Sequence, residues 1–226
     1  MSRVAKYFLL VIAPALAILL ALLGLETLRT NPTGWFLLLV GLAYAIGVII
    51  VYYVRKERFW EPSLSGITTH EEVGDRSYWL FSAGMLVQFY LPPVEYLFFP
   101  AVLPRNGWMT SGGLALIFLG VVLLVVARRI LGRSYSGHIS VKQGQPLVRS
   151  GPYRLIRHPA YAGYLLMALG VSLGYSSLAG LLAVPLLLMP VLIYRMKVEE
   201  QGLIDHFGDA YRQYTRRTRR LIPGIW

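Results

Sequence analysis

Groups that could do chemistry are concentrated in two polar stretches, residues 132–159 and 197–223, of a largely apolar sequence. In the first stretch, Arg157 and His158 stand directly before Pro159, a residue type that favours the first turn of a helix. Backbone N–H groups at a helix N-terminus attract anions, and an arginine adds a bidentate contact to a carboxylate or phosphate. The pattern indicates an anion site, although arginines that face anionic lipid headgroups fit the same charges.

Two adjacent acids, Glu199 and Glu200, follow the last apolar segment and interrupt a strongly basic tail. Arg195 lies four residues before Glu199, so an ion pair on one exposed helix face would account for one acid. It accounts less well for both. Carboxylates only accept hydrogen bonds, and a pair of them is suited to ribose hydroxyls or to a cationic group.

The tail from Tyr211 to Arg220 alternates arginines with tyrosines. Nucleic acid binding fits this composition, but the neighbouring apolar segment favours lipid headgroups or an anionic substrate. His138 stands alone in the first polar stretch, and the histidines show no metal-ligand spacing, so no metal is expected. The sequence has no cysteine, which excludes disulfides and thiolate nucleophiles.

Composition defines the elements that must position these groups. The chain has 226 residues, of which 56% are hydrophobic and only 15% charged, yet its net charge is +11. An average soluble domain is about 45–50% apolar and about 25% charged. A chain this apolar and this basic is predicted to be an all-α integral membrane protein.

Six apolar stretches are expected to form transmembrane helices, each of which needs about 20 residues. The first four are long enough, and the first is interpreted as a retained helix rather than a signal peptide. The last two are short and separated by a polar kink, which favours a tight helical hairpin over a single re-entrant or bent element. The predicted spans are Tyr7–Leu25, Trp35–Val54, Tyr78–Leu103, Ser111–Leu131, Ala160–Tyr175 and Leu178–Met196.

The basic residues predict the orientation of these spans. With the N-terminus in the cytoplasm, only Arg29 and Arg105 fall on the opposite face. The positive-inside rule then gives six helices with both ends in the cytoplasm. The last hairpin brings the two polar stretches together at its cytoplasmic mouth. The other 20 of the 22 Lys and Arg residues lie in segments 1–6, 55–77, 128–158 and 195–226.

Two features of the third span are compatible with a buried polar site. Pro92 and Pro93 interrupt the span, and Glu95 follows them. Neighbouring helices can satisfy such a break, so Glu95 could line a polar cavity. A position at the outer interface is the favoured interpretation.

A longer pattern carries a family resemblance. The residues Gly151–Gly163 (Gly-Pro-Tyr-Arg-Leu-Ile-Arg-His-Pro-Ala-Tyr-Ala-Gly) precede an apolar hairpin, the Glu199-Glu200 pair and a Phe-Gly-Asp-Ala-Tyr-Arg-Gln-Tyr stretch at residues 207–214. In order and spacing these elements resemble the isoprenylcysteine carboxyl methyltransferase family and the related phospholipid N-methyltransferases. The resemblance covers residues 130–223, whereas the first four spans match only as generic membrane helices. The family often has proline where this chain has Arg219.

The resemblance implies a membrane enzyme that uses S-adenosylmethionine without a Rossmann domain. Residues 1–131 would hold four transmembrane helices, and residues 132–226 the catalytic region. The enzyme would lie in the cytoplasmic membrane of a prokaryote or the endoplasmic reticulum of a eukaryote, with its site facing the cytoplasm. The cofactor pocket implied by the resemblance comprises His138, Tyr153, Arg157, His158, Tyr161, Glu199 and Glu200.

The expected methyl acceptor is a lipid or prenylated molecule that enters from the bilayer, with membrane lipids but no nucleic acid or metal as partners. Methyl transfer from a sulfonium depends largely on orientation. A carboxylate acceptor, which is favoured, needs no general base, and Arg217 or Arg220 would position it. An amine acceptor needs a base, for which His138 or a glutamate is available.

Two alternatives stay open at this point. Sterol-reductase-like membrane proteins, which use NADPH, have a similar His-Pro-x-Tyr stretch, but they place an acid where Tyr164 follows Gly163 here. A transporter or structural membrane protein would need polar residues at the bilayer midplane, where the spans offer little beyond Gln88 and Glu95. The clustering of polar residues at one face favours the methyltransferase.

Overall fold

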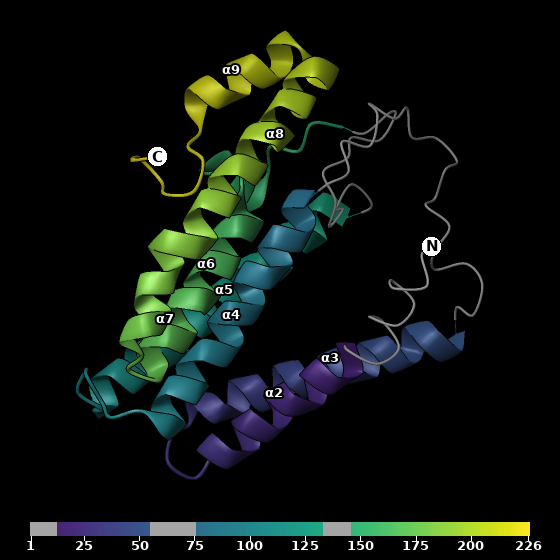
Figure 1. Ribbon diagram of the computed structural model, residues 1–226. Coiled ribbons are helices and arrows are strands. Elements are labelled where there is room, and N and C mark those ends of the chain that lie inside the picture. Colours follow the sequence, from purple (N-terminus) through teal and green to yellow (C-terminus); the bar gives the residue numbers. More distant parts are fainter. Residues whose placement is uncertain (1–12, 55–75, 133–145) are drawn as a thin grey trace.

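The computed structural model describes residues 13–54, 76–132 and 146–226, and every regular element in these ranges is helical. Figure 1 shows the helices as a bundle with a short helix across one end. The predicted all-α class is therefore confirmed for the described part of the chain. The elements are α2 (Ala13–Thr27), α3 (Thr33–Val54), α4 (Arg76–Phe98), α5 (Gly107–Leu131), η3 (Gly151–Arg154), α6 (Pro159–Gly174), α7 (Leu178–Ala183), η4 (Val184–Leu188), α8 (Met189–Phe207) and α9 (Asp209–Arg217).

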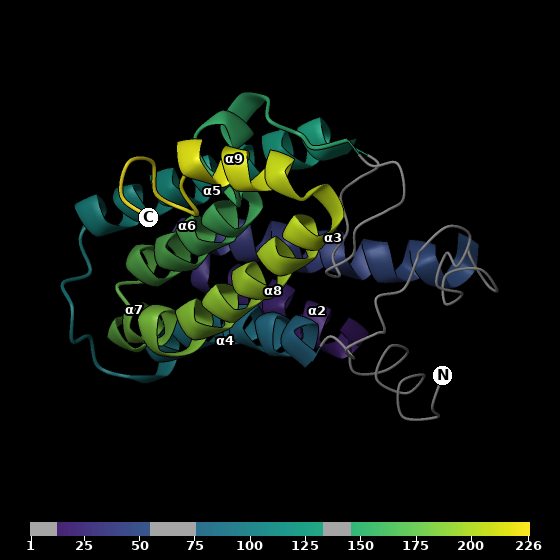
Figure 2. The ribbon, with the colours of Figure 1, turned by 90° about the horizontal axis from the view of Figure 1, so that it is seen from above.

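The bundle consists of α4, α5, α6 and the long run from α7 to α8, with the α2–α3 pair lying at a steep angle to it (Figures 1 and 2). Glycines let α5 and α6 approach closely. A Cβ atom on Gly113 would lie 2.6 Å from the Gly170 carbonyl oxygen, and one on Gly120 would lie 2.6 Å from that of Gly163. Because no larger residue fits there, these glycines fix α6, whose first turn carries the predicted anion site, against α5.

The last two apolar segments form the predicted helical hairpin rather than one re-entrant element. The turn lies between the end of α6 at Gly174 and the start of α7 at Leu178. The returning helix widens to a π-helix at η4, which contains Pro185, a residue without an N–H to donate. Contrary to the expectation, Pro92 and Pro93 do not interrupt their span, since α4 continues through both and ends only at Phe98.

Three turns, which join α2 to α3, α4 to α5 and α6 to α7, meet at the end of the bundle opposite α9 (Figure 1). The Asn31 side-chain amide donates to the Gly174 carbonyl at 2.8 Å, and the Ser176 hydroxyl donates to the Pro104 carbonyl at 3.1 Å. Glu95 also lies here, where its carboxylate accepts from the Ser177 hydroxyl and from the Ala179 N–H at the start of α7. Glu95 is therefore a helix cap at the end where the outer interface is predicted.

Two helical runs within the described ranges are long and apolar enough to cross a membrane, namely Gly107–Leu131 and Leu178–Phe207. Three shorter apolar helices, Pro14–Thr27, Thr33–Ala43 and Pro159–Gly174, coincide with further predicted spans. The helices alternate in direction as six crossings would require. The number of crossings and their orientation stay predictions.

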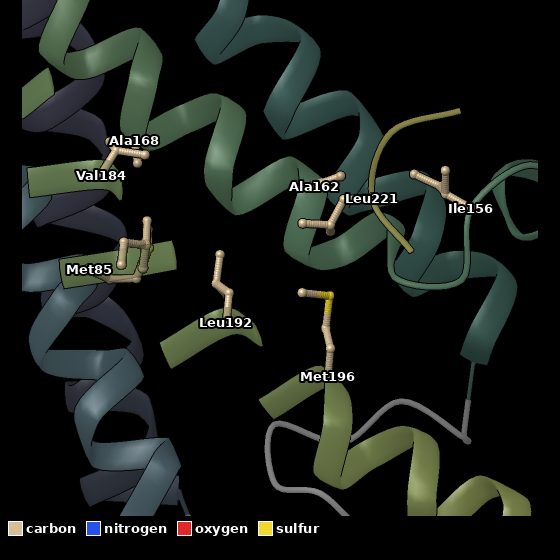
Figure 3. Close-up of a cluster of buried hydrophobic side chains, with 9 residues drawn as sticks. Met85, Ile156, Ala162, Ala168, Val184, Leu192, Met196 and Leu221 are labelled. Atoms are coloured by element: carbon tan, nitrogen blue, oxygen red, sulfur yellow. The ribbon is translucent and has the colours of Figure 1, made fainter. Parts of the chain in front are cut away.

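A buried apolar cluster joins the hairpin to the C-terminal tail (Figure 3). Leu221, from the tail beyond α9, packs in this cluster with Met196 of α8, Ala162 of α6 and Ile156 of the preceding loop. These side chains are 8% exposed or less. Burial of this apolar surface holds the tail over the end of the hairpin, which places it beside the segment before α6.

Candidate functional site

The backbone of the tail runs alongside the segment that precedes α6. The N–H of Arg157 donates to the carbonyl of Arg219 at 2.7 Å, and the N–H of His158 donates to that of Arg220 at 3.1 Å. In return, the N–H of Arg219 donates to the carbonyl of Leu155 at 3.1 Å. This short parallel pairing sets which tail side chains face the start of α6.

The carboxylate of Glu200 lies at the centre of the polar cluster. Its Oε1 atom accepts from Arg157 Nε at 2.7 Å and lies 3.2 Å from His158 Nε2. Its Oε2 atom accepts a fork from Arg220, with Nε at 3.0 Å and Nη2 at 2.8 Å. Because the Glu200 side chain is only 9% exposed, these donors replace the water that a buried carboxylate loses.

Arg157 also closes the C-terminal end of α9. Its Nη1 atom donates to the carbonyls of Thr215 at 3.2 Å and Thr218 at 2.5 Å. The last carbonyls of a helix have no partner within the helix, and the helix dipole favours a cation there. Arg157 thus links α9 to Glu200. The other arginine on this carboxylate, Arg220, has its pKa raised above the usual value by its hydrogen bonds to Glu200.

His158 connects the two acids and an aromatic ring. Its Nδ1 atom lies 3.7 Å from a Glu199 carboxylate oxygen, and its ring stacks on Tyr161 with centroids 5.6 Å apart. The Glu199 side chain is 35% exposed, against 9% for Glu200. The two neighbouring acids therefore differ, because Glu200 is held inside by several donors whereas Glu199 faces the outside.

Arg195 is not the exposed helix-surface residue that its spacing to Glu199 suggests. It is only 2% exposed, and it donates from Nε to the Tyr161 hydroxyl at 3.3 Å and from Nη1 to the Ser77 hydroxyl at 3.1 Å. Its guanidinium also lies over the ring of Phe81, 5.5 Å from the centroid. The i,i+4 rule could not detect this role, because Arg195 faces the interior of the bundle.

Tyr153 anchors the loop before α6 to α9. Its carbonyl accepts from the Tyr214 hydroxyl at 2.7 Å. Burial raises the pKa of Tyr214 to about 12, which keeps its hydroxyl protonated as a donor. Tyr211, three residues earlier on the same face of α9, is 1% exposed. The alternation of tyrosine with arginine in the tail is thus the alternation of a buried and an exposed helix face.

The structure brings most of the predicted site residues together. Arg217 stands apart on the exposed end of α9, and no described residue forms a hydrogen bond or ion pair with it. His138 lies outside the described residues. Sequence reasoning did not find the contributions of Arg195, Tyr211 and the α9 carbonyls, although the i,i+3 spacing of Tyr211 and Tyr214 marked a buried face. The assembled residues are Tyr153, Arg157, His158, Tyr161, Glu199, Glu200 and Arg220.

The chain is similar to known methyltransferases. The family model "Phospholipid methyltransferase" matches residues 108–210. Protein-S-isoprenylcysteine O-methyltransferase B of Arabidopsis thaliana is 28% identical over 147 residues, which are 64% of this chain and 74% of the relative. A probable protein-S-isoprenylcysteine O-methyltransferase of Oryza sativa subsp. indica is 31% identical over 134 residues, 58% of this chain and 69% of the relative.

The fold is also similar to that of a solved structure, the eukaryotic intramembrane Ras methyltransferase described as isoprenylcysteine carboxyl methyltransferase. The TM-score is 0.55 at 21% sequence identity, over 92% of this chain and 73% of that chain. The fold and the sequence matches define a membrane methyltransferase. The chain belongs to the isoprenylcysteine O-methyltransferase family. The reductase and transporter alternatives have no support among these matches.

Proposed function

We propose that the chain transfers a methyl group from S-adenosylmethionine to the carboxylate of a prenylated or lipid acceptor in the membrane. The observation that carries this proposal is the cluster around Glu200 at the end of the apolar hairpin, in which Arg157, His158 and Glu200 lie within the residues that the family model matches. The acceptor class is taken from the relatives, whose names describe action on S-isoprenylcysteine. We place the catalytic region in residues 132–226.

The residues at the mouth of the hairpin fit a nucleoside sulfonium. Glu199 is partly exposed and can accept from ribose hydroxyls or an amino group. The face of Tyr161, which is stacked on His158, can attract a cation. Arg157 and the first turn of α6 suit a carboxylate. When bound, S-adenosylmethionine would supply an electrophilic methyl group.

Arginines near the site are suited to holding an acceptor carboxylate. Arg220 uses Nε and Nη2 for Glu200, which leaves Nη1 outside that fork, and its side chain is 29% exposed. Arg217 is a second candidate on the exposed end of α9. A carboxylate attacks without losing a proton, so these residues need only orient it. His138 is retained as a cofactor contact and, for an amine acceptor, as the base.

The orientation of the site follows from the charge distribution in the sequence. With both ends of the chain in the cytoplasm, the site faces the cytoplasm and the cofactor enters from water. The acceptor reaches it from the lipid through the apolar helices. A protease or labelling experiment on sealed vesicles, directed at the tail after Arg217, tests this arrangement.

A label-transfer experiment tests the function. The purified protein is incubated with methyl-labelled S-adenosylmethionine and an S-farnesylcysteine derivative, and the product is treated with base. We expect labelled methanol, because a methyl ester is cleaved by base. A label that resists base indicates N-methylation, and the absence of label transfer to farnesylcysteine or to a total lipid extract would refute the proposal. A short-chain S-alkylcysteine is the matched control for the prenyl group.

A further inference from the structure

Tyr211 carries a buried hydroxyl group for which the described residues offer no hydrogen-bond partner. The residue is 1% exposed. Tyr214, on the same face of α9, is also buried, but its hydroxyl donates to the Tyr153 carbonyl at 2.7 Å. Buried hydroxyls are normally satisfied, because leaving one without a partner costs free energy. The Tyr211 hydroxyl therefore differs from its neighbour and needs an explanation.

The surroundings of Tyr211 connect its hydroxyl to the site. The carbonyl of Thr215, one turn further along α9, accepts from Arg157, which binds Glu200. Burial raises the pKa of the Tyr211 phenol, and the nearby carboxylates of Glu200 and Glu199 raise it further. The hydroxyl thus stays protonated and is available as a hydrogen-bond donor.

The two acids differ in what they can still accept. Glu200 takes hydrogen bonds on both oxygens from Arg157, His158 and Arg220. Glu199 is 35% exposed and has His158 Nδ1 at 3.7 Å. A ligand group that faces both Tyr211 and Glu199 must therefore accept from the first and donate to the second. A hydroxyl does both, whereas an ammonium group only donates.

We propose that Tyr211 donates a hydrogen bond to a ribose hydroxyl of the bound methyl donor while that hydroxyl donates to Glu199. The inference rests on the proposed use of S-adenosylmethionine and assigns the ribose contact within the same site. Tyr211 is then a specificity-determining residue of α9, and the tail contributes directly to cofactor recognition. No bond is made or broken by this contact.

The first test compares Tyr211→Phe with Tyr214→Phe in detergent-solubilised full-length protein. Without added ligand, Tyr211→Phe should melt at the same temperature as wild type or higher, because the substitution removes an unsatisfied buried hydroxyl. Tyr214→Phe should melt at a lower temperature, because it removes the buried hydrogen bond to the Tyr153 carbonyl. A melting temperature of Tyr211→Phe as low as that of Tyr214→Phe would overturn the proposal, since the Tyr211 hydroxyl would then have a structural partner.

The second test measures binding of S-adenosylhomocysteine and of its 2′-deoxy and 3′-deoxy analogues by calorimetry. Tyr211→Phe should weaken binding of S-adenosylhomocysteine about fivefold to tenfold, the range of one hydrogen bond. For at least one deoxy analogue, the same substitution should change affinity less than about twofold, because the partner hydroxyl is already missing. Unchanged affinity, or equal losses with all three ligands, would overturn the ribose assignment. Failure of wild type to bind S-adenosylhomocysteine would instead refute the proposed function, and the inference with it.

Discussion

The two ends of the helical bundle both contain a carboxylate with several partners, but they use it differently. At the end with the three turns, Glu95 accepts from a serine hydroxyl and a backbone N–H, which are neutral donors. At the other end, Glu200 accepts from Arg157 and His158 in the segment before α6 and from Arg220 in the tail. Neutral donors suffice where a carboxylate caps a helix, whereas the donors around Glu200 include two charged side chains.

The difference illustrates two uses of polar side chains, one that stabilises turns and one that assembles charged groups in the candidate site. Asn31 and Ser176 each donate to a backbone carbonyl near a neighbouring turn, so each hydrogen bond joins two turns of the fold. The cluster at Glu200 instead gathers cations that would repel one another without the carboxylate. Buried charge is costly, and a fold keeps it mainly where chemistry requires charged groups. We therefore expect substitutions at the two ends to affect stability and activity in different proportions.

The largest effect is expected for Glu200→Gln. The substitution keeps the volume but leaves Arg157, 10% exposed, without its carboxylate. Breaking a buried pair by removing one partner costs about 3–5 kcal/mol. Because the same pair positions the site, the rate of methyl transfer should fall about a hundredfold or more. Initial rates with labelled S-adenosylmethionine and thermal unfolding in detergent measure both effects.

Glu95→Gln is the matched control for that experiment. It removes a helix cap, which costs about 0.5–2 kcal/mol, and it leaves the Glu200 cluster intact. The methyl-transfer rate should stay within about threefold of wild type. Equal losses of rate in the two variants would break the distinction between the two ends.

The next effect in size is expected for Arg220→Lys. A lysine keeps the charge but cannot form the fork that Nε and Nη2 make with Glu200. We expect the rate of methyl transfer to fall about tenfold and the melting temperature to fall less than in Glu200→Gln. Arg212→Lys, at an exposed position on α9, is the control and should retain the wild-type rate. A wild-type rate for Arg220→Lys would show that charge alone is needed there.

Local patterns predicted most of the helices, and the reasons for the failures are equally specific. Apolar length predicted Ser111–Leu131 and Trp35–Val54, where the structure has Gly107–Leu131 and Thr33–Val54. The prolines of α4 did not break it. Apolar and aromatic residues lie on both the buried and the exposed sides of this span, as Leu192 (0% exposed) and Tyr194 (53% exposed) do, so the sequence did not reveal that Arg195 points inward.

Sequence reasoning named most of the residues that gather around Glu200, but it did not predict how they pair. The resemblance placed Arg157 and Glu200 in one pocket, whereas their direct ion pair depends on the register between the tail and the segment before α6. That register is set by the pairing of Ile156 with Arg219 and by the packing of Leu221. Such long-range contacts leave no periodic signal in the sequence, so the expectation that Arg217 or Arg220 positions the acceptor did not include the fork from Arg220 to Glu200.

A smaller effect, confined to stability, is expected for Asn31→Ala at the end with the turns. The Asn31 side chain donates to the Gly174 carbonyl and accepts from the Thr33 N–H at 2.9 Å. Removing both buried contacts should lower the free energy of unfolding by about 1–3 kcal/mol. The affinity for S-adenosylhomocysteine should not change, since the site lies at the opposite end. A weaker affinity at temperatures well below melting would show that the two ends are coupled.

The smallest effect is expected for Asp209→Asn, although Asp209 lies at the charged end of the molecule. Its ion pair with Arg212 joins side chains that are 84% and 63% exposed, and water screens such pairs. The substitution should change the free energy of unfolding by less than about 1 kcal/mol and leave the methyl-transfer rate at its wild-type value. Urea unfolding and initial rates check both expectations. A loss of stability or rate that approaches that of Glu200→Gln would contradict the comparison. The two ends of the bundle would then differ in charge density and not in the burial of one shared carboxylate.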